Sequence, residues 1–211
     1  MINLIKRLIV KTLGLKNYLR ILQRTYFLLY QTGLLKYSST YEYQYFVKHL
    51  INEGDIIIDI GANLGYYSFL FAKWTGGSGR VLSVESNSVY NEIFNEKAIN
   101  YRNITHYPYI LGTEVQMKKP SALFGNLDRI DYIKCDIEGF EYIVLSDMKE
   151  VIRKHKPKVQ VEVWSNNKEK MLELFDELGY TPYKLHKFQL APQGENDPPL
   201  PGDYIFIYHD N

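Results

Sequence analysis

The sequence predicts an α/β protein in which a mostly parallel sheet is covered by helices on both faces. Short apolar, β-branched runs alternate along the chain with longer segments of helical periodicity. One run, 56–60, carries Asp59 near its end and leads into the glycine-bounded turn Gly61–Gly65, and two later runs end in Glu85 and Asp136. Because parallel strands present their carboxyl ends at one edge of a sheet, we expect these three acids to share a ligand site there.

The remaining elements follow from the same patterns and from their start and stop residues. We expect strands over 56–60, 80–85, 104–111, 130–136 and 159–164, and helices over 41–51, 64–74, 87–99, 140–155 and 168–178. A closing antiparallel pair is expected from 182–185 and 204–208, joined by the proline-rich loop 191–203. Segment 113–128 shows no clear helical or strand periodicity.

Composition limits the function classes. The 211 residues suffice for one α/β domain with a small appendage, and the net charge of +1 argues against general nucleic-acid binding. Cys135 is the single cysteine, so no disulfide can form within the chain, which favours a reducing cytoplasm. The five histidines are scattered, and we expect no metal site. We find no signal peptide and no apolar run long enough to span a bilayer.

The N-terminal part of the chain has a composition of its own. Residues 1–36 carry seven Lys or Arg and no acid, and they form two amphipathic helical patterns, 1–10 and 18–30, interrupted near Gly14 and ended at Gly33. We therefore divide the chain into an N-terminal helical cap, 1–50, and a ligand-binding domain, 51–211. The cap is expected to pack on the core and shield the site, although contact with an anionic membrane surface is a second interpretation.

The turn after the first strand discriminates between cofactors. A dinucleotide site expects Gly-x-Gly-x-x-Gly, but Asn63 stands where the second glycine would be and obstructs close approach of a pyrophosphate. Asp59 would repel a diphosphate and attract an ammonium group, and Glu85 is placed to accept hydrogen bonds from ribose hydroxyls. S-adenosylmethionine carries an ammonium, a carboxylate and a ribose, so we expect it rather than NAD(P).

Two motifs together resemble a known family. Residues Asp59–Ser68, with sequence DIGANLGYYS, and the run Ile133–Glu141, with sequence IKCDIEGFE, are similar to the two hallmark motifs of the FkbM-type S-adenosylmethionine-dependent methyltransferases. The resemblance covers about residues 54–165. It implies a Rossmann-like class I methyltransferase fold with a mostly parallel, seven-stranded sheet. It also implies a cofactor site formed by Asp59, Gly61, Asn63, Gly65, Ser68, Glu85, Ser86 and Asp136.

One stretch departs from the family pattern. Between Glu85 and Lys134 the chain is shorter than is usual in such proteins, where a loop over the pocket follows the third strand. Either the substrate site is trimmed or a stretch is missing from the sequence. We therefore assign no substrate contacts to 113–128.

Three acids are candidates for catalysis. Methyl transfer to a hydroxyl releases a proton, so a base near the reacting methyl group assists it. Glu138 follows the fourth strand directly, Asp136 ends that strand near the methyl group by resemblance, and Glu162 lies late in the fifth strand. Glu141, one helical turn beyond Glu138, is a further candidate base. The alternative role of Glu138 is to stabilise the N-terminus of the following helix by its charge.

These observations favour an S-adenosylmethionine-dependent methyltransferase, with O-methylation of a sugar, glycolipid or small metabolite as the expected reaction. We expect a small-molecule or glycan acceptor, no nucleic-acid partner, and a cytoplasmic protein with a possible peripheral membrane contact through residues 1–36. The alternatives are an NAD(P)-dependent oxidoreductase and a non-catalytic ligand-binding protein on the same fold. The oligomeric state is left open.

Overall fold

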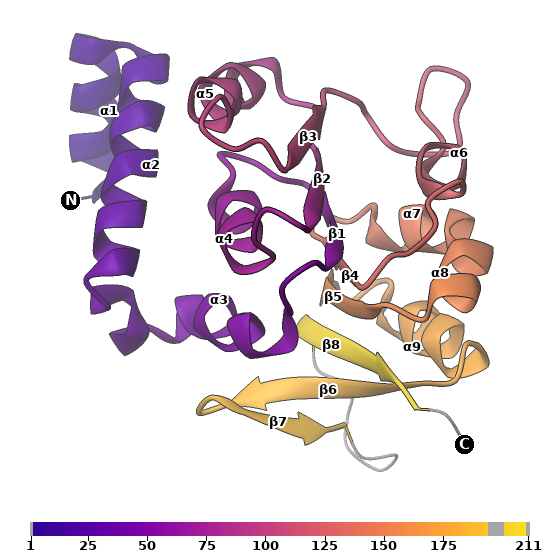
Figure 1. The fold of residues 1–211 in the computed structure, drawn as a ribbon. Helices are drawn as coiled ribbons and strands as arrows, with labels where there is room; N and C mark the ends of the chain where they lie inside the picture. The colour runs from indigo at the N-terminus through magenta and orange to yellow at the C-terminus, as the bar shows by residue number, and fades with distance from the viewer. Residues whose placement is uncertain (1, 194–200, 210–211) are drawn as a thin grey trace.

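A twisted sheet of eight strands runs through the computed structural model, which describes residues 2–193 and 201–209 (Figure 1). The strand order is β3-β2-β1-β4-β5-β8-β6-β7. The strands are β1 (Ile56–Ile60), β2 (Arg80–Val84), β3 (Ile104–Tyr107), β4 (Tyr132–Cys135), β5 (Lys158–Val163), β6 (Tyr180–His186), β7 (Gln189–Pro192) and β8 (Gly202–Tyr208). The first five strands are mutually parallel, whereas β8, β6 and β7 join by antiparallel pairing. This confirms the predicted α/β class.

Helices cover both faces of the sheet, as predicted (Figure 1). The α-helices are α1 (Ile2–Leu13), α2 (Leu15–Gln31), α3 (Glu42–Phe46), α4 (Tyr66–Trp74), α5 (Ser88–Ala98), α6 (Pro120–Phe124), α7 (Glu141–Asp147), α8 (Lys149–His155) and α9 (Lys168–Glu177). Helices α4 and α5 cover one face, with the N-terminal helices outside them, and α6 to α9 cover the other. Short 3₁₀ helices, η1 (Leu34–Tyr37), η2 (Ser39–Tyr41) and η3 (Val47–Leu50), connect the N-terminal segment.

The predicted count of seven strands is wrong by one, because β6 turns back into β7. Lys187 and Phe188 form the two-residue connection with φ angles of 49° and 60°. This left-handed pair is the geometry of a tight hairpin, which glycine and asparagine normally signal. A Lys-Phe pair carries no such signal, so the hairpin was missed. Of the predicted loop 191–203, residues 194–200 lie outside the described residues.

Other boundaries differ from prediction for local reasons. The third strand ends at Tyr107 rather than at residue 111, because Pro108 has no N–H to continue the ladder. The helix predicted over 140–155 is divided into α7 and α8 at Met148, whose ψ of 4° leaves the helical range. The helix predicted over 41–51 is a one-turn α-helix, α3, followed by the 3₁₀ helix η3. Segment 113–128, for which no period was found, contains α6.

The two N-terminal helices form a hairpin around Gly14, in which α1 packs on α2 and α2 packs on α4 and α5 (Figure 1). In α2, Leu19, Tyr26 and Phe27 are buried. The buried Gln23 donates from Nε2 to the carbonyl of Leu64 at 2.6 Å. Arg20 Nε donates to Glu96 Oε2 of α5 at 2.9 Å. These contacts tie α2 to the glycine turn and to α5.

Candidate active site

The carboxyl ends of β1, β2 and β4 open into a cavity of about 580 Å³. All three acids predicted to meet at this edge, Asp59, Glu85 and Asp136, line it. So do Gly61, Asn63, Ser86 and Glu138, whereas Gly65, Ser68 and Glu162 are outside the lining. Most of the site residues predicted from sequence thus line one cavity, and Gly65, Ser68 and Glu162 do not.

The glycine turn has a backbone that requires its residue types. Gly61 has φ +80°, and a Cβ atom there would lie 1.8 Å from the carbonyl oxygen of Asp136. Gly65 has φ +81°, and a Cβ there would lie 2.3 Å from the Phe69 ring. Asn63 also adopts positive φ, at 51°, which asparagine tolerates. The turn therefore brings β1 and the strand end at Asp136 closer together than any side chain would permit.

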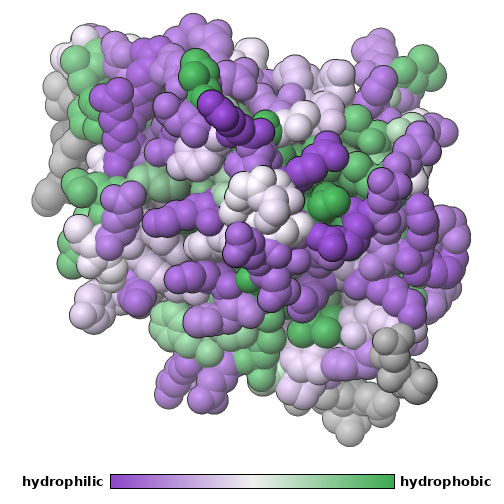
Figure 2. Space-filling model, viewed as in Figure 1, coloured by the Kyte–Doolittle hydropathy of each residue, from purple (hydrophilic) through white to green (hydrophobic). Residues whose placement is uncertain are grey.

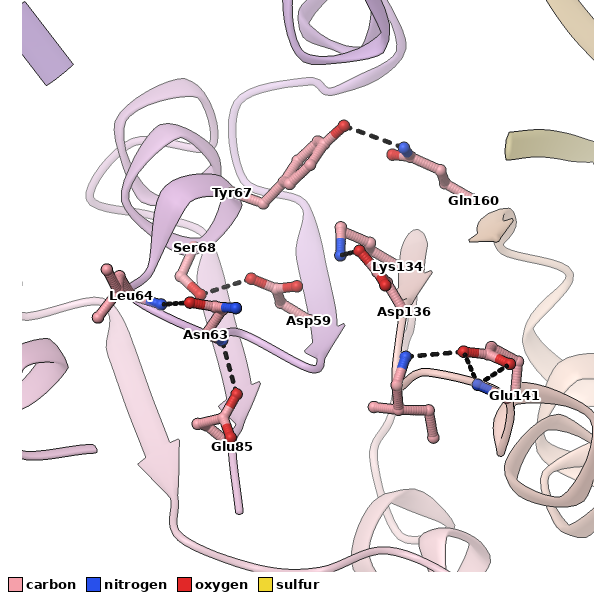
Figure 3. A network of polar contacts seen from close by, with 12 residues as sticks. Asp59, Asn63, Leu64, Tyr67, Ser68, Glu85, Lys134, Asp136, Glu141 and Gln160 are labelled. Atoms are coloured by element: carbon pink, nitrogen blue, oxygen red, sulfur yellow. Dashed lines mark hydrogen bonds and ion pairs between the residues drawn. The ribbon is translucent and has the colours of Figure 1, made fainter. Parts of the chain in front are cut away.

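Glu85 clamps this turn from the neighbouring strand (Figure 3). Its Oε2 accepts from the backbone N–H of Asn63 at 2.8 Å, and its Oε1 accepts from the N–H of Asn87 at 2.7 Å. The residue is 9% exposed, and each carboxylate oxygen keeps a lone pair for a further donor. Sequence reasoning placed Glu85 against a ribose, but it did not foresee that the same carboxylate fixes the turn.

Asp59 lies at the base of the cavity and is fully buried. Its Oδ2 accepts from Ser68 Oγ at 2.5 Å (Figure 3). Ser83 Oγ donates to Ser68 Oγ at 2.9 Å. Asp59 Oδ1 has no hydrogen-bond partner among the described residues. Burial raises the pKa of Asp59, and the charge of Lys134 and the Ser68 hydrogen bond oppose that rise. Ser68 therefore orients Asp59, and Oδ1 of Asp59 remains free to accept a hydrogen bond from a buried donor.

Lys134 and Asp136 form an ion pair beside Asp59. Lys134 Nζ donates to Asp136 Oδ2 at 3.1 Å, and it lies 4.8 Å from the centre of the Tyr67 ring. The Tyr67 hydroxyl in turn accepts from Gln160 Nε2 at 3.1 Å (Figure 3). Sequence reasoning gave Lys134 little weight, yet it is 3% exposed and lines the cavity.

Beyond Asp136 lies a group of carboxylates. Asp136, Glu141 and Glu162 bring oxygen atoms within 4.8 Å of one another. The buried Glu141 accepts from the N–H of Ile137 at 2.8 Å and of Gly139 at 3.1 Å, so it holds the loop after β4. Glu141 is not among the residues that line the cavity, so its position does not support the role of base that the sequence suggested for it. Three carboxylates in this spacing could hold a cation, and no further observation points to one.

Glu138 occupies the loop between β4 and α7. It has a positive φ of 57°, is exposed and lines the cavity. The helix α7 begins only at Glu141, with Phe140 as its N-cap residue. The alternative role of Glu138, charge stabilisation in the first turn of a helix, is therefore not supported by its position.

Glu162 is half-buried, and its environment predicts a pH-dependent stability. Burial, and then the charges of Asp136, Asp203 and Glu138, raise the pKa of Glu162 to about 7. A carboxyl group whose pKa is higher in the folded than in the unfolded state destabilises the fold when it is ionised. This loss of stability is absent below the pKa of the unfolded state and is complete above about pH 7. We expect Glu162→Gln to raise the free energy of unfolding by about 1 kcal/mol near pH 8, after solvent screening, and to change it little near pH 4. Urea denaturation at both pH values measures this, with exposed Glu173→Gln of α9 as control. A less stable Glu162→Gln protein near pH 8 would contradict the expectation.

Several cavity residues could not be identified from sequence. They come from distant segments and are mostly aromatic or apolar, so each alone looks like a core or surface residue: Gln44, Tyr66, Tyr67, Tyr90, Tyr109, Ile110, Leu111, Met117 and Phe140. Gln44 belongs to the N-terminal segment, and Met117 to the stretch 113–128, which the sequence did not connect with the site. Tyr67 was expected to be a core residue of its helix.

The arrangement fits the cofactor expected from sequence. The free Oδ1 of Asp59 can accept from an ammonium group, and the Glu85 carboxylate can accept from hydroxyls. Gly61, Ala62 and Asn63 of the glycine turn line the same cavity. Both acceptors face one cavity large enough for a nucleoside with an amino-acid side arm.

Comparisons with known proteins bear on the family and the fold. Residues 113–182 match the methyltransferase FkbM domain. This match includes the second motif, 133–141, and it begins after the glycine turn. Among curated proteins, none matches the sequence. The FkbM resemblance inferred from the two motifs is confirmed.

Solved structures share the fold at low sequence identity. Methyltransferase FkbM from Methylobacillus flagellatus KT has a TM-score of 0.59 at 18% identity, covering 79% of this chain and 47% of that chain. A SAM-dependent O-methyltransferase from Thermotoga maritima has a TM-score of 0.53 at 17% identity, covering 80% of this chain and 65% of that one. Aeropyrum pernix fibrillarin with natively bound S-adenosyl-L-methionine has a TM-score of 0.52 at 14% identity, with 75% and 68% covered. This chain thus spans about half of the FkbM structure.

Proposed function

We propose that the chain is an FkbM-type class I methyltransferase that uses S-adenosylmethionine, and that it methylates a hydroxyl oxygen of a small molecule or glycan. The observation that carries this proposal is the pair of carboxylates, Asp136 and Glu138, in the wall of the cavity that begins at the glycine turn. A hydroxyl acceptor must lose a proton, and a carboxylate within reach can take it.

We propose the following roles at the cofactor end. Asp59 accepts from the ammonium group, and Ser68 holds Asp59 in place from behind. Glu85 accepts from the ribose, with Ser86 beside it in the cavity wall. Gly61, Asn63 and Gly65 shape the turn that the cofactor lies against. S-adenosylmethionine supplies a methyl group already activated by its sulfonium.

At the acceptor end, the chain's own residues orient the hydroxyl and accept its proton. Glu138 is the proposed base because it lines the cavity and is accessible. Asp136, which is paired with the buried Lys134 and lines the cavity, faces the positive charge of the cofactor and orients the acceptor. Glu162 is outside the lining and near Asp136, so we propose that it affects the reaction through Asp136. Proper alignment of acceptor and methyl group contributes most of the rate.

The charge of the site supports a small neutral or glycan acceptor over a nucleic acid. Within the part of the chain that the structure describes, Lys134 is the one cation lining the cavity, and it is paired with Asp136. The acids Asp136, Glu138 and Glu162 near this end would repel phosphates, whereas nucleic-acid sites neutralise them with Lys and Arg.

Substitution of Glu138 tests the proposed base. We expect Glu138→Gln to lower kcat about 100-fold and to leave the Kd for S-adenosylmethionine within about threefold, because only the proton acceptor is removed. The assay follows labelled methyl transfer to a panel of sugars, glycolipids and small hydroxylated metabolites. Glu169→Gln, on exposed α9, is the control.

Two results would contradict the proposal. Transfer to amines alone would exclude O-methylation, and transfer to RNA but to no sugar, glycolipid or small metabolite would exclude the proposed acceptor class. Full activity of Glu138→Gln would remove Glu138 as the base.

We also propose that residues 1–50 form an extension on a methyltransferase domain, 51–211, and that residues 1–36 contact membranes peripherally. No helix among the described residues has the length and apolarity needed to cross a bilayer. On the side of the molecule that α1 and α2 occupy, hydrophobic residues lie among hydrophilic ones (Figure 2). Leu13, Leu28 and Leu34 are 48%, 60% and 56% exposed, and no acid occurs in this segment to oppose anionic lipid.

Vesicle co-sedimentation tests the membrane contact. We expect the chain to sediment with vesicles that contain anionic lipid and to remain in solution with neutral ones. The double variant Leu28→Ser with Leu34→Ser should bind the anionic vesicles at least about tenfold more weakly, since burial of each leucine contributes about 2 kcal/mol. Recovery of the wild-type chain in the supernatant with the anionic vesicles would exclude the membrane contact.

A further inference from the structure

Lys134 sits at the centre of a row of buried polar side chains that crosses the sheet. It pairs in register with Asp59 of β1 on one side and with Gln160 of β5 on the other. The next strand, β2, adds Ser83 opposite Asp59. All four residues are at most 3% exposed. Residues in register on neighbouring strands point to the same face, so the row lies under α4 and faces the cavity floor.

The ammonium group of Lys134 is enclosed by specific partners. It donates to Asp136 Oδ2 at 3.1 Å and lies 4.8 Å from the centre of the Tyr67 ring (Figure 3). Gln160 holds the Tyr67 hydroxyl at 3.1 Å and itself accepts from the Tyr132 hydroxyl at 3.1 Å. A buried ammonium persists only where such partners offset its desolvation. The lysine therefore has a fixed position.

The charges around Lys134 are unequal. Burial alone would lower the pKa of Lys134, but the carboxylates of Asp136 and Asp59 outweigh burial and raise it. The lysine accordingly stays charged, and one cation faces two carboxylates. The Asp136 side chain is 44% exposed, compared with 4% for that of Lys134. The ammonium therefore anchors Asp136 from behind while the carboxylate faces the cavity.

We propose that Lys134 is a positioning residue, whose ammonium holds the Asp136 carboxylate turned into the cavity, where it faces the positive charge of the cofactor. The proposal rests on the cofactor site proposed above. Without the ammonium, Asp136 would stand beside Asp59 with no compensating charge. The pKa of the buried Asp59, which burial already raises, would then rise further beside Asp136, and a protonated Asp59 would deprive the site of a negative charge that the cofactor needs.

The experiment measures binding of S-adenosylmethionine by calorimetry, which requires no acceptor. Lys134→Met should bind S-adenosylmethionine about tenfold more weakly than wild type near pH 6. This difference in affinity should narrow toward pH 8, because the protonated carboxyl group ionises as the pH rises. Lys134→Arg, which keeps the charge, should stay within about threefold. Lys158→Met, a strand lysine at the opposite edge of the sheet, is the matched control and should bind like wild type.

A change of pH also titrates neighbouring groups, and wild type measured in parallel corrects for them. The charged groups that face Asp136 from the surrounding elements are Asp59, Lys134, Glu138, Glu141, Glu162 and Asp203.

A double-variant cycle isolates the action through Asp136. The cycle compares the fold-loss of affinity that Lys134→Met causes in wild type and in an Asp136→Asn background. We expect that fold-loss to be at least about threefold smaller in the Asp136→Asn background. An equal loss in both backgrounds, or a loss that does not change between pH 6 and pH 8, would overturn the proposal. If Lys134→Met alone does not fold, the double variant Lys134→Met with Asp136→Asn decides. A folded double variant supports the claim that Lys134 compensates the charge of Asp136, and an unfolded one refutes it. Failure of wild type to bind S-adenosylmethionine would instead refute the cofactor site.

Discussion

Gly61→Ala is expected to abolish measurable binding of S-adenosylmethionine and to destabilise the fold. A Cβ atom at this position would lie 1.8 Å from the backbone carbonyl oxygen of Asp136 and 3.0 Å from the Ile137 side chain. The backbone also has φ +80°, which costs an alanine about 1–2 kcal/mol before any clash. Since a backbone atom cannot rotate away, β1 and the end of β4 must separate. We expect a loss of about 3 kcal/mol in the free energy of unfolding and of at least 100-fold in affinity.

The measurements are thermal unfolding and calorimetric titration. A loss of about 3 kcal/mol corresponds to a decrease in Tm of about 10 °C for a chain of this size. Gly77→Ala is the matched control, since Gly77 lies in the loop after α4, has an ordinary φ and has nothing within 4 Å of an added Cβ. Wild-type affinity in Gly61→Ala would show that the turn does not contact the cofactor.

The second large effect is expected from Glu85→Gln. Both carboxylate oxygens accept from backbone N–H groups, of Asn63 at 2.8 Å and of Asn87 at 2.7 Å. A glutamine amide offers one oxygen, and its NH₂ group would face the second N–H, so one buried donor loses its partner. Together with loss of charge toward the ribose, this should cost about 2–3 kcal/mol of cofactor binding, or about 30- to 150-fold in Kd.

Calorimetry with S-adenosylmethionine and with adenosine measures this loss of affinity. A loss of affinity for both ligands is expected, because both carry the ribose. The control is Glu96→Gln, which removes an exposed ion pair with Arg20 of α2, far from the cavity lining, and should change stability by less than about 1 kcal/mol. Unchanged affinity for both ligands in Glu85→Gln would show that Glu85 acts neither on the turn nor on the ribose.

Much of the fold was predictable because local patterns and tertiary packing agree there. The run 56–60 became β1 with identical bounds, and Asn87 caps α5 by accepting from Val89 and Tyr90. The elements that sequence missed or misjudged have weak local signals. The Lys187-Phe188 turn lacks glycine, and α6 is one short turn in a segment without period. In both places long-range packing, not propensity, fixes the backbone.

In the candidate site, too, some features were predictable from the sequence and others were not. The acids Asp59, Glu85 and Asp136 could be assigned to one edge from topology alone, since parallel strands align their ends. Their individual roles could not, because they depend on contacts between residues far apart in the chain. Sequence cannot tell that Glu85 accepts from Asn63, or that Ser68 lies behind Asp59 rather than in the cavity wall.

The amino-acid sequence by itself determined the strand and helix order, the glycine turn and the edge at which the acids gather, because these follow from periodicity and local backbone preference. Only the tertiary structure decided which carboxylates are free, clamped or paired. The register between β1 and β4 places Lys134 beside Asp59, and the close approach at Gly61 brings β1 against the backbone of Asp136. Such contacts set desolvation and charge, and these depend on distance in space rather than on separation along the chain.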